Sequence, residues 1–105
     1  MIGWIRVCGR SEMLPGEFRV VYDGDTAIAV FNIDGAFYAI EDVCTHDGGE
    51  LAGGPVEGFE VECLRHGARF DVRTGEATCA PAYTPTVSFP TRIEEDAVWT
   101  RDDRD

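Results

Sequence analysis

The chain has 105 residues, 44% of them hydrophobic, and a formal net charge of −11 from 20 acidic and 9 basic residues. This length suits one domain that buries a core without disulfides. The acidic balance excludes the basic surface of nucleic-acid-binding proteins. No stretch of eighteen apolar residues occurs and the first residues lack a signal-peptide pattern, so we expect neither a membrane span nor a leader.

Short runs with strand-like character follow one another along the chain. The predicted strands cover residues 4–8, 18–22, 26–31, 37–40, 59–62, 70–72, 87–93 and 97–101. Turn signals such as 23–25 and 34–35 separate them, residues 11–14 predict a single helical turn, and the polar residues 101–105 predict a frayed tail. Short strands at regular spacing predict an all-β sandwich or barrel.

Aromatic side chains within these runs are expected in the core, since no other role is needed to explain them. They are Trp4, Phe31, Phe37, Tyr38, Phe89 and Trp99, with Phe70 expected beneath the second of the motifs described next.

Two Cys–His pairs are the most informative feature of the chain. Cys44-Thr45-His46 is followed after sixteen residues by Cys63-Leu64-Arg65-His66. In each pair the Cys and His are close enough in sequence to line one tight loop around a metal. Thiolate and imidazole together suit zinc or an iron–sulfur cluster. Structural zinc sites usually group like ligands, whereas each loop here supplies one of each, which favours two differently ligated irons. Structural zinc is the alternative.

The motif resembles the ligand signature of Rieske proteins, in which two Cys hold one iron of a 2Fe–2S cluster and two His hold the other. The resemblance implies one 2Fe–2S cluster, with the metal and cofactor ligands Cys44, His46, Cys63 and His66. It extends to the glycines that follow each pair, to residues 66–71 running into a strand, and to the proline-containing residues 79–85 as a loop covering the cluster. Leu64 stands where the family commonly has proline, and removes no ligand.

From residue 4 to 99 the chain resembles a small bacterial ferredoxin of the aromatic-ring dioxygenase type. The resemblance implies one Rieske-like domain over 1–105, an antiparallel β-sandwich with a cluster-binding subdomain inserted at about 43–85. It also implies a cytoplasmic, monomeric one-electron carrier, not an enzyme. The carrier would take electrons from an NAD(P)H-dependent flavin reductase and pass them to a terminal ring-hydroxylating oxygenase. The alternative is the Rieske-like small subunit of a nitrite reductase or another oxidoreductase.

Further expectations concern the remaining cysteines and the reduction potential. High-potential Rieske proteins carry an extra Cys in each cluster loop, forming a disulfide, and these loops have none. Cys8 and Cys79 could then pair only with each other, and in a cytosolic protein they are instead expected to be two buried, reduced thiols. High-potential members also place Ser and Tyr hydroxyls near the cluster sulfurs, where this chain has Ala68 and Phe70, which implies a low potential. The negative charge either attracts basic redox partners or serves solubility.

Overall fold

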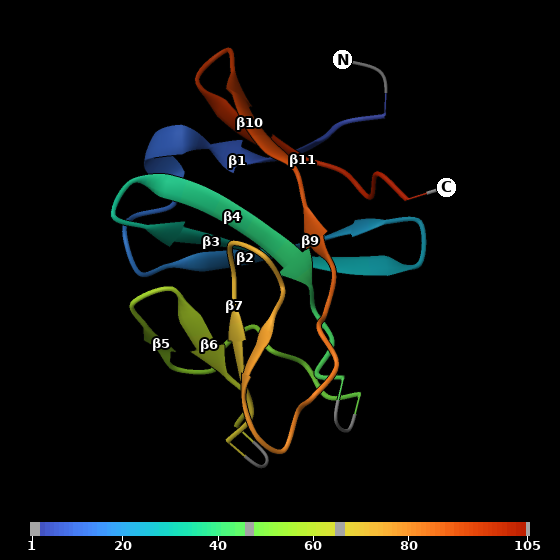
Figure 1. Ribbon diagram of the computed structural model, residues 1–105. Coiled ribbons are helices and arrows are strands. Elements are labelled where there is room, and N and C mark those ends of the chain that lie inside the picture. Colours follow the sequence, from blue (N-terminus) through green and yellow to red (C-terminus); the bar gives the residue numbers. More distant parts are fainter. Residues whose placement is uncertain (1–2, 46–47, 65–66, 105) are drawn as a thin grey trace.

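The protein is described by a computed structural model covering residues 3–45, 48–64 and 67–104. Over these residues the regular structure is strands in three antiparallel sheets, with one turn of 3₁₀ helix (Figure 1). This confirms the predicted all-β class. The elements are β1 (Ile5–Gly9), η1 (Arg10–Glu12), β2 (Phe18–Asp23), β3 (Thr26–Ile33), β4 (Ala36–Glu41), β5 (Val56–Glu57), β6 (Glu60–Glu62), β7 (Arg69–Asp71), β8 (Ala77–Cys79), β9 (Ser88–Phe89), β10 (Thr91–Glu94) and β11 (Ala97–Thr100).

The second sheet lies between the other two. Its strand order is β2-β3-β4-β9, while the first sheet is β1-β11-β10 and the third is β5-β6-β7-β8 (Figure 1). The third sheet comes entirely from residues between β4 and β9. Its strands are short, and the turns and loops around it occupy the lower part of the view in Figure 1.

The protein has two clusters of buried hydrophobic side chains, and strand β3 contributes side chains to both. Successive side chains of a strand point to opposite faces. Ile28 and Val30 pack toward the first sheet with Val98, whereas Ala29 and Phe31 pack with residues of the third sheet. Because both faces are covered, β3 is apolar along most of its length and shows little hydrophobic alternation.

The predicted strand 87–93 is in fact two strands in different sheets. Ser88 and Phe89 pair with β4, whereas residues 91–94 pair with β11. Pro90 lies between the two strands. Proline has no amide hydrogen, so it cannot donate the hydrogen bond that would continue the pairing with β4. The sequence analysis also missed the short strands β5 and β8.

The C-terminal segment is not frayed over the residues described. The amide of Asp102 donates to Asp23 Oδ2 at 2.9 Å, and Thr26 Oγ1 donates to Asp102 Oδ2 at 2.8 Å. Arg104 forms ion pairs with Asp102 and Glu41 at 2.9 and 3.3 Å. The hydrogen bond from Arg104 lowers the pKa of Asp102 well below its usual range. The polar residues that predicted disorder therefore fasten the tail to the β2–β3 turn and to β4.

Most of the aromatic predictions are confirmed. Phe31, Phe37, Phe70 and Phe89 are buried, and Tyr38 is half-buried against the core beneath the third sheet. Trp4 and Trp99 are half-buried and belong to neither core cluster, so these two predictions were wrong. Arginine side chains cover the ring of Trp4, and Trp99 Nε1 donates to the Glu94 carbonyl.

In the described part of the chain, no helix is long and apolar enough to cross a membrane.

Candidate metal centre

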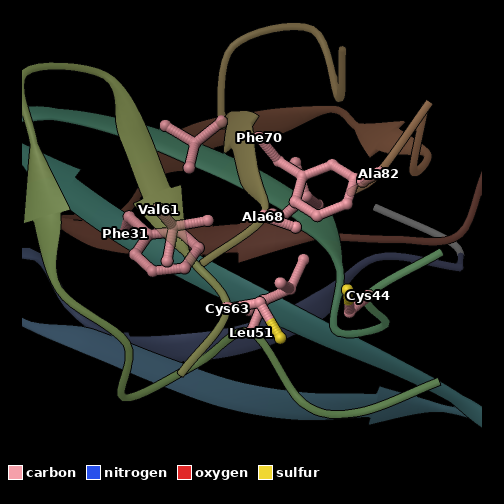
Figure 2. Packing of buried hydrophobic residues seen from close by; sticks show 11 residues of the cluster. Phe31, Cys44, Leu51, Val61, Cys63, Ala68, Phe70 and Ala82 are labelled. Carbon is pink, nitrogen blue, oxygen red and sulfur yellow. The ribbon is translucent and has the colours of Figure 1, made fainter. Parts of the chain in front are cut away.

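Two of the four predicted ligands lie together in the core beneath the third sheet. Cys44 follows β4 and Cys63 follows β6, and their exposed fractions are 0% and 1%. Both belong to one buried cluster, and Figure 2 shows their side chains at the same end of it. Both thiols are free of disulfides. The other two predicted ligands, His46 and His66, lie outside the described residues.

The two cysteines begin loops with the same backbone hydrogen bonds. In the first loop (residues 44–49), the Cys44 amide donates to the Gly49 carbonyl, and the amide of Gly48 donates back to the Cys44 carbonyl, both at 2.7 Å. In the second loop (residues 63–68), the Cys63 amide donates to the Ala68 carbonyl at 2.7 Å. The amide of Gly67 donates back to the Cys63 carbonyl at 3.0 Å.

The two loops therefore match in the described residues at their ends. The glycine four residues after each cysteine has a left-handed φ, 77° at Gly48 and 78° at Gly67. Glycine adopts this conformation without the strain that a Cβ brings. In the sequence, one histidine falls between cysteine and glycine in each loop. The fold therefore presents two matched loops, each with a buried thiol at its base.

The surroundings of the two thiols are apolar. Ala68 and Phe70 are fully buried and lie next to the cysteine side chains in the same cluster (Figure 2). Ala82, from the proline-containing segment, belongs to the same buried cluster; that this segment covers the metal centre stays a prediction. Neither Ala68 nor Phe70 carries a hydroxyl that could donate to a sulfur atom. Buried thiols without these donors disfavour added negative charge at a group that they hold.

Asp42 braces the first loop and was missed by the sequence analysis. Its buried carboxylate accepts hydrogen bonds from the amides of Leu51 and Ala52, both at 2.7 Å through Oδ1. Its own amide donates to the carbonyl of Ala27 on β3 at 2.9 Å. One residue thus ties the start of the loop segment to its end and to the second sheet. These bonds span nine and ten residues of the chain, so local side-chain patterns of the kind that mark caps and turns do not identify Asp42.

A second brace joins the first loop to the proline-containing segment. The hydroxyl of Thr45 donates to the carbonyl of Thr84 at 2.5 Å. The neighbouring residue Thr86 donates from its hydroxyl to the Glu41 carbonyl at 3.2 Å. Two segments separated by about forty residues in the sequence are therefore held beside the same thiols.

The cysteines outside the motif are separated from this site and from each other. Cys8 is buried in the core between the first and second sheets, where burial raises the pKa of its thiol. Cys79 ends β8 and is exposed, so the expectation that it is buried was wrong. The reason is that β8 is the edge strand of the third sheet, where no further strand covers it. Both are free thiols.

Comparison with known proteins agrees with the geometry. The family model of the Rieske [2Fe-2S] domain matches residues 3–90. The ferredoxin component of a naphthalene 1,2-dioxygenase system from Pseudomonas putida is 36% identical over 93 residues, 89% of each chain. The ferredoxin subunit of a biphenyl dioxygenase from Pseudomonas sp. (strain KKS102) is 40% identical over 90 residues, covering 85% of this chain and 83% of its own.

Solved structures give the same result. A chain from the complex of reduced oxygenase and oxidised ferredoxin in carbazole 1,9a-dioxygenase superposes with a TM-score of 0.92 at 35% identity, covering 98% of this chain and 96% of its own. A small subunit of an NADH-dependent nitrite reductase from Mycobacterium tuberculosis has a TM-score of 0.85 over 97% of this chain and 96% of its own, at 20% identity. The second similarity shows the fold alone. With its family model matched over most of its length, the chain belongs to the Rieske [2Fe-2S] domain family.

Proposed function

We propose that this protein is the ferredoxin of an aromatic-ring-hydroxylating dioxygenase system. It would carry one electron at a time from an NAD(P)H-dependent flavin reductase to a terminal oxygenase. The observation that carries the proposal is the pair of matched loops with buried thiols, in a chain similar over 89% of its length to a dioxygenase ferredoxin. In this role the chain itself makes or breaks no covalent bond. Its residues bind the group that transfers the electron, shield it and hold it where a partner can reach it.

We infer that Cys44 and Cys63 hold one iron of a 2Fe–2S cluster and that His46 and His66 hold the other. Two observations support this ligand set: the thiols are buried in one apolar cluster, and each loop contains one of the chain's two histidines. Soft thiolates suit this group. When bound, such a cluster supplies a site for one electron. We propose further that the chain acts as a single-domain cytoplasmic monomer whose residues 43–85 form the cluster-binding part.

A reconstituted system tests this function. With the reductase, the oxygenase, an aromatic substrate and NAD(P)H present, omission of this protein should reduce hydroxylated product at least tenfold. If its charge of −11 steers the encounters, turnover should fall between about 0.01 M and about 0.5 M ionic strength, because salt shortens the Debye length. Product formation that does not depend on the protein would contradict the proposal. A flat salt response would assign the charge to solubility.

The apolar surroundings of the thiols predict a low reduction potential that hydroxyl groups would raise. The wild type should lie near or below about −100 mV, in the lower part of the Rieske range. In the variants Ala68→Ser and Phe70→Tyr, a hydroxyl that donates to a sulfur would stabilise the reduced form. One such bond contributes on the order of 1 kcal/mol, which corresponds to several tens of millivolts for one electron, given about 59 mV per tenfold change.

Voltammetry on the single and double variants measures this shift. Ala39→Ser is the matched control, because Ala39 is also buried but belongs to the other core cluster. Its hydroxyl should leave the potential unchanged. A wild-type potential above zero would contradict the low-potential assignment. An unchanged potential in the double variant would show that these two side chains do not reach the sulfur atoms.

The alternative function is that of a subunit of another oxidoreductase, such as a nitrite reductase. The shared fold with the mycobacterial subunit permits it. The identities of 36% and 40% to dioxygenase ferredoxins favour the carrier. A stable complex with a nitrite reductase catalytic subunit, together with failure to support ring hydroxylation, would favour the alternative.

A further inference from the structure

One edge of the second sheet exposes a row of apolar side chains. Phe18, Val20 and Tyr22 alternate along β2, with exposed fractions of 40%, 36% and 65%. These three residues are called the β2 strip. Large side chains in a row on an edge strand are unusual on a protein that works alone, because such edges favour association.

The β2 strip faces the same side of the sheet as the candidate metal centre. Phe18 pairs with Phe31 on β3, and their rings lie 6.4 Å apart. Phe31 belongs to the buried cluster that contains Cys44 and Cys63. The alternate residue Val21 packs instead into the opposite core. The strip is therefore the part of this face that the third sheet and its loops leave uncovered.

The Phe18 end of the strip lies close to the segment that follows the first loop. A Cβ placed on Gly53, four residues after that loop, would lie 3.9 Å from the Phe18 ring. At the other end, Tyr22 pairs with Ala27 of β3, and β3 separates Tyr22 from Asp42, whose amide donates to the Ala27 carbonyl. A surface that covers the Phe18 end of the strip would therefore also reach the segment that leaves the first loop.

A depression lies at the Phe18 end of the strip. It has a volume of about 630 Å³ and is open to solvent, and its lining includes Phe18, Phe31, Pro55 and Val56. Val56 is itself 38% exposed. An apolar side chain of a partner protein could be seated there, in the manner of anchor residues at protein interfaces.

The charges bordering the strip are negative. Glu17 precedes Phe18, Asp25 lies in the β2–β3 turn, and Asp34 lines the depression, and all three are exposed. The one arginine within β2, Arg19, is turned to the other face, where Nη2 donates to the Glu12 carbonyl at 2.7 Å. Arg104 reaches Thr26 at the Tyr22 end of the strip at 3.4 Å, but its charge is matched there by Asp102 and Glu41 at 2.9 and 3.3 Å. A fitting partner therefore has an apolar centre bordered by Lys or Arg.

This charge pattern selects the occupant. A second copy of the chain would bring another net charge of −11 against the same acidic border, which opposes self-association. Resting on the proposed function, the reduced protein carries one more negative charge than the oxidised protein. A basic border therefore binds the reduced form more strongly, and the partner that must bind the reduced form is the electron acceptor.

We propose that the β2 strip and the adjoining depression form a docking surface for the terminal oxygenase, extending the contact from the cluster loops along the side of the molecule. The oxygenase contributes an apolar patch bordered by basic side chains. The reductase, which binds the oxidised form, does not use the strip.

The test is a double variant, Val20→Thr and Tyr22→Thr. Threonine keeps the β-propensity of the strand, and both side chains are exposed, so the fold and the visible spectrum should be retained. The control is Ile93→Thr, since Ile93 is 44% exposed on β10 in a different sheet. The dissociation constant of the reduced protein for the oxygenase, measured anaerobically by titration, should rise about tenfold in the double variant. It should change less than about twofold in the control.

The outcomes distinguish the inference from the function on which it rests. The KM of the reductase for the double variant should equal that for the wild type. An unchanged oxygenase affinity, or an equal loss with both partners, would refute the assignment of the strip. A wild-type dimer that the double substitution converts to a monomer would assign the strip to a second copy instead. If the wild type neither binds nor reduces the oxygenase, the proposed function itself is wrong.

Discussion

Replacing either Cys44 or Cys63 by serine is expected to remove the cluster altogether. Both thiols are buried in one apolar cluster and begin the two matched loops. Each is the single cysteine of its loop, and a serine hydroxyl lacks the soft thiolate that this group selects. Iron and acid-labile sulfide should fall from about two each per chain to near zero, with loss of the visible absorption. Because metal binding contributes to folding, the apo variants should also unfold at a lower temperature.

Other substitutions separate the ligands from the remaining cysteines. His46→Ala and His66→Ala should also lose the cluster, although less completely. Cys79→Ser is the control, because this thiol is exposed at the end of β8, and Cys8→Ser changes a residue of the other core. Both should retain the wild-type spectrum. Cluster loss in either control would refute this division of the cysteines, and stoichiometric zinc without sulfide in the wild type would refute the cluster.

The second large effect is expected from Gly75→Ala, in the turn between β7 and β8. Gly75 has a φ of +84°, and a Cβ there would lie 2.2 Å from the Thr86 carbonyl oxygen. The amide of Thr86 also donates to the Gly75 carbonyl at 2.8 Å. The substitution would push the third sheet away from the segment that returns to β9. Left-handed strain costs about 1–2 kcal/mol, and the clash adds about 1–3 kcal/mol.

Gly35→Ala provides the matched comparison. Gly35 has a similar φ of +91°, and no atom lies within 4 Å of a Cβ placed there. This variant should lose only the strain contribution, about 1–2 kcal/mol. Urea unfolding of both holo-proteins measures the difference. Since a domain is stable by only about 5–15 kcal/mol, Gly75→Ala should be markedly less stable than Gly35→Ala. Equal losses would show that the turn moves away from Thr86 without cost.

The sequence by itself determined most of the strand pattern and the presence of two Cys–His pairs suited to zinc or an iron–sulfur cluster. Strand alternation and turn residues act over a few positions, so most of the strands could be predicted from local sequence. The spacing of each Cys and His is equally local, because both belong to one short loop. The expectation that Ala68 and Phe70 lie beside the thiols came from the family resemblance, and the structure places both in the cluster that contains Cys44 and Cys63.

Only the tertiary structure decided what covers each residue. The run 87–93 divides at Pro90 because its two halves find partners in different sheets. Cys79 is exposed because β8 is an edge strand, and the tail is fixed because Asp23, Thr26 and Glu41 meet it from distant parts of the chain. The alternation of β2 was readable from the sequence. That the third sheet stops short of β2, leaving Phe18, Val20 and Tyr22 uncovered, depends on contacts between segments far apart in the chain, which no local pattern encodes.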